Sequence, residues 1–135
     1  MLTSPKRSSA KPLVLVAEDE AIIALELEDS LISAGFEVAG PFSTCAEAEA
    51  WLKAGEPDAA ILDNQLKDGP CDALAADLSR RGVPLVIFSG HDDQRDATSP
   101  DWKACWLTKP IRFPALRTAL QAQMSEQAQT SSAQP

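Results

Sequence analysis

The stretch AAILD at residues 59–63 places four apolar residues directly before an aspartate, and a polar loop ending in Gly69 follows it. A short apolar run bounded by turn residues is typical of a buried strand, so Asp63 is predicted to stand at its carboxyl end. Ligands bind at that edge of an open α/β sheet. Taken alone, the pattern favours an aspartate that hydrogen-bonds its own turn. The rest of the chain changes this interpretation.

Length and composition indicate one soluble, cytoplasmic domain. The 135 residues suffice for a single core of ordinary size. The formal net charge of −8 repels nucleic acid, so direct DNA binding is not expected. No apolar run approaches the roughly 20 residues of a membrane span, and MLTSPKRSSAKP at the start lacks the apolar stretch of a secretory signal. Widely spaced Cys45, Cys71 and Cys105 predict reduced thiols without chemistry.

Apolar runs alternate with segments of helical period along the chain. Strands are predicted at residues 13–17, 37–40, 59–63, 83–88 and 104–107. Helices are predicted at residues 21–34, 44–54 and 71–81 and from residue 114 onward, while the polar segment 91–100 allows at most a short, poorly anchored one. This alternation predicts an α/β flavodoxin-like (βα)5 fold, a doubly wound parallel sheet of strand order 2-1-3-4-5.

The predicted domain comprises residues 13–124. Residues 1–12 are rich in Ser, Lys and Pro and are predicted to form a disordered tail. A second disordered tail is predicted at residues 125–135, where Gln, Ala and Ser predominate.

Charged or hydroxyl side chains follow four of the five predicted strands. Glu18 and Asp19 follow the first, Asp63 ends the third, Ser89 follows the fourth and Lys109 the fifth. Because the first and third strands are neighbours at the topological switch point, the three carboxylates are expected to meet and repel one another. Lys109 compensates for one negative charge, and Mg²⁺, which prefers carboxylate oxygens and waters, can compensate for more.

The segments LVLVAEDE, PDAAILD, PLVIFSG and CWLTKP, in this order and in these strand contexts, resemble a response regulator receiver domain of bacterial two-component signalling. The resemblance covers roughly residues 13–124. It implies phosphorelay signal transduction, in which a histidine kinase or a histidine phosphotransfer domain donates a phosphoryl group to Asp63 with Mg²⁺ as cofactor. Such a protein catalyses only its own phosphorylation and dephosphorylation and is otherwise no enzyme.

The resemblance also implies a role for each matching residue. Asp63 matches the phospho-acceptor, Asp19 the direct metal ligand, and Glu18 its partner that acts partly through water. Gln65 falls where the family offers a backbone carbonyl to the metal.

Three further positions concern the phosphoryl group and the response to it. Ser89 matches the hydroxyl residue that hydrogen-bonds the phosphoryl group, and it belongs with Trp106 to the switch pair. Lys109 matches the lysine that pairs with the phosphoryl group. Pro110 matches the proline that follows this lysine, often through a cis bond.

The sequence departs from the family pattern in two places. The loop from Asp63 to Gly69 is short and lacks the common proline, and residues 91–102 are polar where the family builds its fourth helix.

His91 is expected to be a loop residue, with a secondary hypothesis that it influences the water attacking the acyl phosphate. Few residues follow Met124, so a stand-alone receiver is expected, acting as a switch on an unknown downstream protein or as a phosphate sink.

The alternative is a degenerate receiver serving as a phosphorylation-independent interaction module. The intact set of acidic, hydroxyl and lysine residues argues against it. An aspartyl-phosphate hydrolase would need a second aspartate where Gln65 stands, and the acidic AEDE would repel the phosphate of a flavin.

Overall fold

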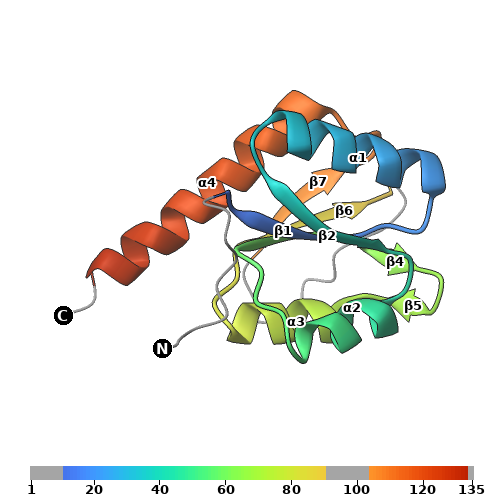
Figure 1. The fold of residues 1–135 in the computed structure, drawn as a ribbon, viewed down its shortest axis with the longest axis horizontal. Helices are drawn as coiled ribbons and strands as arrows, with labels where there is room; N and C mark the ends of the chain where they lie inside the picture. Colours follow the sequence, from blue (N-terminus) through green and yellow to red (C-terminus); the bar gives the residue numbers. More distant parts are fainter. Residues whose placement is uncertain (1–10, 91–103, 134–135) are drawn as a thin grey trace.

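The computed structural model describes residues 11–90 and 104–133 of the chain. Within these residues a five-stranded parallel sheet of order β2-β1-β3-β6-β7 lies between two layers of helices (Figure 1). Its strands are β1 (Leu13–Ala17), β2 (Glu37–Phe42), β3 (Ala59–Asp63), β6 (Leu85–Ser89) and β7 (Cys105–Thr108). When β4 and β5 are left out and the other strands are numbered along the chain, their order in the sheet is 2-1-3-4-5. The predicted flavodoxin-like α/β fold is therefore confirmed.

Helices cover both faces of the sheet. They are α1 (Ala21–Ser33), α2 (Cys45–Leu52), α3 (Asp72–Arg80) and α4 (Phe113–Ala133). Figure 1 shows α1 and α4 on one face and α2 and α3 on the other. Side chains alternate along β1, so Leu15 packs with the α2/α3 cluster while Val14 and Val16 pack with the α1/α4 cluster. Burial on both faces explains why the strands are continuously apolar. The segment 91–100, with His91, lies outside the described residues.

The strand register brings the predicted site residues to one edge of the sheet. Ala17 pairs with Leu62, and Asp63 pairs with Phe88 on β6. The residues that follow β1 therefore lie beside Asp63, and Ser89 ends the next strand. This alignment requires only that the strands are parallel and nearly in step.

Strand β2 is longer than predicted and ends at Phe42 instead of Gly40. The pairing of β1 with β2 shifts between Leu15 and Ala17, and this shift accommodates Gly40. Gly40 has φ of +105°, and a Cβ there would lie 2.7 Å from both the Phe42 nitrogen and the Val16 oxygen. Glycine alone fits such a position. The Gly40-Pro41 and Lys109-Pro110 peptide bonds are both cis.

The loop after Asp63 forms a small antiparallel hairpin that the sequence analysis did not predict. Its strands are β4 (Gln65–Leu66) and β5 (Gly69–Pro70). Leu66 is buried in the α2/α3 cluster, which anchors one side of the hairpin. Gly69 has φ of +123°, a conformation that side chains other than glycine rarely adopt.

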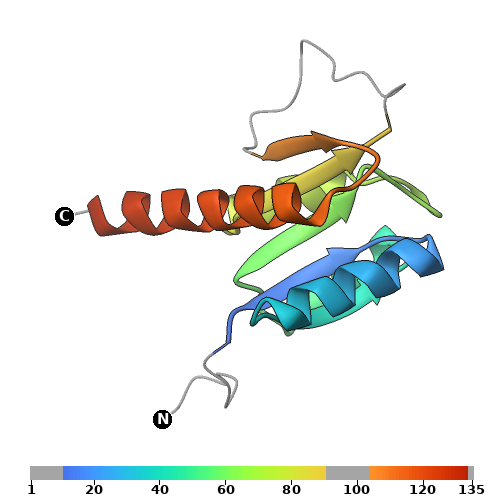
Figure 2. The same cartoon turned by 90° about the horizontal axis from the view of Figure 1, so that it is seen from above.

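Helix α4 continues to Ala133 and so includes most of residues 125–135, for which the sequence predicted a disordered tail. Leu116 and Leu120 anchor its first turns in the core. Residues 121–133 contain no glycine or proline to end the helix, which is a physical reason for its extension past the sheet (Figure 2). Within the described ranges, no helix is both long and apolar enough to cross a membrane.

Candidate functional site

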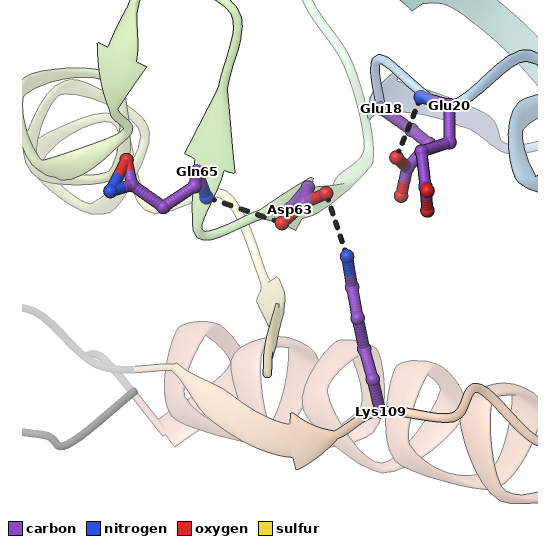
Figure 3. A network of polar contacts seen from close by, with 5 residues as sticks. All are labelled: Glu18, Glu20, Asp63, Gln65 and Lys109. Atoms are coloured by element: carbon purple, nitrogen blue, oxygen red, sulfur yellow. Dashed lines mark hydrogen bonds and ion pairs between the residues drawn. The ribbon is translucent and has the colours of Figure 1, made fainter. Parts of the chain in front are cut away.

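A partly buried ion pair forms the centre of the site. Asp63, at the end of β3, is 5% exposed, and its Oδ2 lies 2.9 Å from the Lys109 ammonium (Figure 3). Lys109 follows β7, and its backbone N–H donates to the carbonyl of Ser89 at the end of β6, at 2.9 Å. The lysine side chain thus reaches past the end of β6 to the neighbouring strand β3. The ion pair between Asp63 and Lys109 thus joins residues that are 46 positions apart in the sequence.

Two more carboxylates lie beside Asp63. Glu18 and Asp19 follow β1, and carboxylate oxygens of these residues and Asp63 lie within 4.8 Å of one another. Glu18 is 3% exposed, and its Oε2 accepts a hydrogen bond from the Glu20 backbone N–H at 3.0 Å (Figure 3). Its Oε1 is buried and has no hydrogen-bond partner among the described residues. A buried oxygen in this condition is costly unless a ligand or a proton satisfies it.

This arrangement fits a hard divalent cation. Carboxylate oxygens are the ligands that Mg²⁺ and Ca²⁺ prefer, and Mg²⁺ is typically held by one or two of them plus waters. No described group satisfies Glu18 Oε1, and Lys109 donates to Asp63, so a cation bound here would satisfy this oxygen. The residues present could therefore hold Mg²⁺ next to Asp63.

The electrostatics of the site follow from burial and crowding. Burial raises the pKa of Glu18 to about 7, and the charge of Asp63 adds to this rise, while the Glu20 N–H and Lys109 oppose it. For Lys109, burial lowers the pKa, but the hydrogen bond and charge of Asp63 outweigh it, so the net shift is upward. Lys109 is therefore firmly protonated at neutral pH. The site combines a stable cation with a glutamate that is partly protonated.

We expect the pKa of Glu18 to make the metal-free protein less stable as the pH rises. Between pH 4.5 and about 7 the folded chain retains a proton on Glu18 that the unfolded chain has released. The free energy of unfolding should therefore fall by about 2 kcal/mol through this window and remain low above it. Urea unfolding in chelator, at about pH 5 and about pH 8, measures the change.

The matched control for this pH effect is Glu18→Gln, which has nearly the same shape and does not titrate. The difference between the two proteins isolates Glu18, because every other group titrates in both. Equal pH slopes for the native chain and the variant would contradict the assigned shift.

The remaining predicted residues lie around this centre at different depths. The Gln65 backbone N–H donates to Asp63 Oδ1 at 3.2 Å, and its side chain is exposed. Ser89 is 7% exposed at the end of β6. Trp106 lies within β7, opposite Ile87, and packs half-buried against the α2/α3 cluster. The carbonyl of Gln65 as a ligand, the hydroxyl of Ser89 as a donor and Trp106 as a switch remain predictions.

Asp68, at the tip of the hairpin, was not among the residues predicted from the sequence. Its carboxylate accepts hydrogen bonds from the backbone N–H groups of Cys45 at 2.8 Å and Ala46 at 3.0 Å. The Asp68-Gly69 pair was visible as a turn signal. Its partners on α2 lie 22 and 23 positions earlier, so no local pattern could have identified them.

The cysteines take no part in this site. All three are free thiols. Burial, followed by nearby negative charge, raises the pKa of Cys45 to about 11 and that of Cys71 to about 12. Such thiols are poor nucleophiles at neutral pH.

Comparison with known proteins identifies the class to which this fold and site belong. Residues 14–121 match the family described as the response regulator receiver domain. The chain therefore belongs to this family and is a receiver domain of two-component signalling.

Individual relatives agree with this assignment. The transcriptional regulatory protein PdtaR of Mycobacterium tuberculosis is 32% identical over 117 residues, and the match covers 83% of this chain but only 56% of that protein. A response regulator receiver protein from Sinorhizobium medicae has a TM-score of 0.77 at 28% identity, covering 87% of this chain and 98% of the other. SdrG from Sphingomonas melonis Fr1 has a TM-score of 0.72 at 35% identity, covering 86% and 98%.

Proposed function

We propose that this receiver domain accepts a phosphoryl group onto Asp63 from a histidine kinase or a histidine phosphotransfer protein in a Mg²⁺-dependent reaction. The observation that supports this most directly is the environment of Asp63. Its buried carboxylate stands at a strand end with an ammonium group 2.9 Å from one oxygen and two further carboxylates within reach of a shared cation. A purely structural ion pair would not need the additional crowded carboxylates.

The chain's own residues account for the transfer step. An oxygen of Asp63 attacks phosphorus in line, forming an acyl phosphate while the bond from phosphorus to the donor breaks. Phosphoryl transfer needs positioning and charge neutralisation more than covalent help. Lys109 and the Ser89 hydroxyl would bind the phosphoryl oxygens as negative charge builds on them.

The cation would be held by the acidic side of the site. Asp19 and Asp63 are proposed as direct ligands, with Glu18 acting partly through water and Gln65 offering its backbone carbonyl. When bound, Mg²⁺ supplies positive charge next to the phosphoryl oxygens. The three clustered carboxylates exceed the single ammonium of Lys109, so the chain favours this occupant electrostatically.

The direct test is phosphorylation of the purified chain by acetyl phosphate with Mg²⁺, read as the mass of one added phosphoryl group. The output is proposed to be an altered affinity for a downstream protein, or withdrawal of phosphoryl groups from a kinase. A pull-down with and without the phosphoryl mimic beryllium fluoride separates these, because only a switch changes its binding.

We expect Trp106 to report phosphorylation by its fluorescence. The strand register places Ser89 opposite Thr108 and Ile87 opposite Trp106, so Ser89 and Trp106 are diagonal neighbours on one sheet face. If Ser89 moves toward the phosphoryl group, the space behind it admits the indole. In a Trp51→Phe, Trp102→Phe variant, Mg²⁺ with beryllium fluoride should shift or quench the Trp106 emission.

The control for this experiment adds Asp63→Asn, which should remove the response. Trp51, whose ring centroid lies 6.3 Å from that of Phe42, must be replaced because its own emission would overlap that of Trp106. Trp102, which lies outside the described residues, is replaced because it also emits. Unchanged Trp106 emission, with binding of the mimic shown independently, would exclude Trp106 as the switch.

A further inference from the structure

The hairpin after Asp63 is fastened at its tip to the start of helix α2. The two carboxylate oxygens of Asp68 accept the N–H groups of Cys45 and Ala46, and Thr44 Oγ1 accepts the N–H of Glu47 at 3.0 Å. These are among the N–H groups that a helix cannot satisfy internally. A carboxylate at this end also interacts favourably with the helix dipole. The N-terminus of α2 is thus capped by a residue distant in sequence. Figure 1 shows β4 and β5 beside α2.

The segment just before α2 also contacts the loop that carries Glu18 and Asp19. The carbonyl of Phe42, at the end of β2, accepts a hydrogen bond from the backbone N–H of Glu18 at 2.8 Å. Residues 42–46 therefore contact both the loop that carries Glu18 and the hairpin that follows Asp63. This segment thus connects two of the loops that contribute residues to the proposed cation site.

The base of the hairpin lies at the site itself. The Gln65 N–H donates to Asp63 Oδ1, the Asn64 N–H donates to the Phe88 carbonyl at 2.7 Å, and the Cys71 N–H donates to the Asn64 carbonyl at 3.0 Å. The base is held by β3 and β6, and Leu66 packs into the α2/α3 cluster. The far end is held to α2 by Asp68 and by the Cys45 thiol, which donates to the carbonyls of Gly69 at 3.9 Å and Pro70 at 3.7 Å. Two-residue strands are marginal by themselves, so the position of Gln65 depends on these attachments.

We infer that Asp68 is a positioning residue for the cation site, because its carboxylate clamps the hairpin to α2 and thereby holds the Gln65 backbone beside Asp63. This inference rests on the proposed Mg²⁺-dependent function. The hydrogen bonds from Cys45 and Ala46 lower the pKa of Asp68, so the clamp is charged at neutral pH.

The test compares Asp68→Ala with Asp68→Asn in the full chain. Both variants lose the same charge, but only asparagine retains a carbonyl oxygen that can accept one of the two N–H groups. Asp72→Asn is the matched control, because it removes an exposed carboxylate four positions away on the first turn of α3. Because both Asp68 variants lose the same charge, a difference in cation affinity between them reports the hydrogen bonds and not the lost charge.

The readout is cation affinity, measured with Mn²⁺ through the electron paramagnetic resonance of the free ion and by competition with Mg²⁺. Asp68→Ala should weaken binding roughly tenfold, the lower end of the loss seen when groups that orient metal ligands are removed, and Asp68→Asn only a few-fold. Asp72→Asn should change it less than about twofold, since exposed charges interact weakly through water. Urea unfolding verifies that each variant is folded.

Amide hydrogen exchange of the metal-free proteins tests the clamp directly. The Cys45 and Ala46 amides should exchange faster in Asp68→Ala, while amides within α3 keep their native rates. Faster exchange with native cation affinity would mean that Asp68 only caps α2, and it would overturn the positioning role. Absence of cation binding by the native chain would instead contradict the proposed function itself.

Discussion

Replacing Asp63 with asparagine is expected to abolish phosphoryl uptake from acetyl phosphate. The amide has nearly the same shape as the carboxylate but lacks the anionic oxygen that attacks phosphorus. Labelling should fall more than about 100-fold, because no other described carboxylate combines burial at a strand end with direct contact to Lys109. Intact-protein mass spectrometry after incubation with acetyl phosphate and Mg²⁺ measures the labelled fraction.

The matched control for this experiment is Asp72→Asn, which makes the same chemical change at an exposed position on α3. This variant should be labelled at the native rate. Urea unfolding of the Asp63→Asn protein excludes misfolding as the cause of lost labelling. Undiminished labelling of Asp63→Asn would refute the assignment of the acceptor.

The second large effect concerns the cation. Asp19→Ala should weaken Mg²⁺ binding at least tenfold, by the ordinary scale for altering a metal site, and phosphorylation should stop in excess chelator. Asp19 is only half-buried, and its removal relieves repulsion among the clustered carboxylates. The metal-free variant should therefore be no less stable than the native chain. Titration calorimetry with Mg²⁺ measures the affinity.

Glu26→Ala serves as the control, because Glu26 is an exposed carboxylate on α1, beyond the loop that carries Glu18 and Asp19. It should leave Mg²⁺ affinity within about twofold of native, as expected for a solvent-screened charge. Native rates of phosphorylation in excess chelator would show that the cation is dispensable, and Lys109 would then be the only positive charge at the site among the described residues.

Local patterns in the sequence were sufficient for the sheet and for the edge that carries the candidate site. Strands buried on both faces must be continuously apolar, so LVLVA and AAILD were recognisable without any partner. Polar residues that directly follow parallel strands share one edge, which places Glu18, Asp63 and Ser89 together. Lys109 follows the fifth strand and was expected to compensate one negative charge of the cluster, and in the structure its ammonium contacts Asp63.

Tertiary packing decided the features whose partners are distant in the chain. Asp68 meets α2 only because the strand order places the hairpin beside the start of that helix. Gly40 is required because its φ is +105° and because Val16 and Phe42 approach it. Packing also anchors the first turns of α4, where Leu116 and Leu120 are buried. Periodicity and turn propensity act over a few residues, so the sequence alone determined the strands of the main sheet, the helices that cover it and the chemistry at the strand ends. The folded chain decided how the loops between these elements are held, because those contacts exist only when distant segments meet.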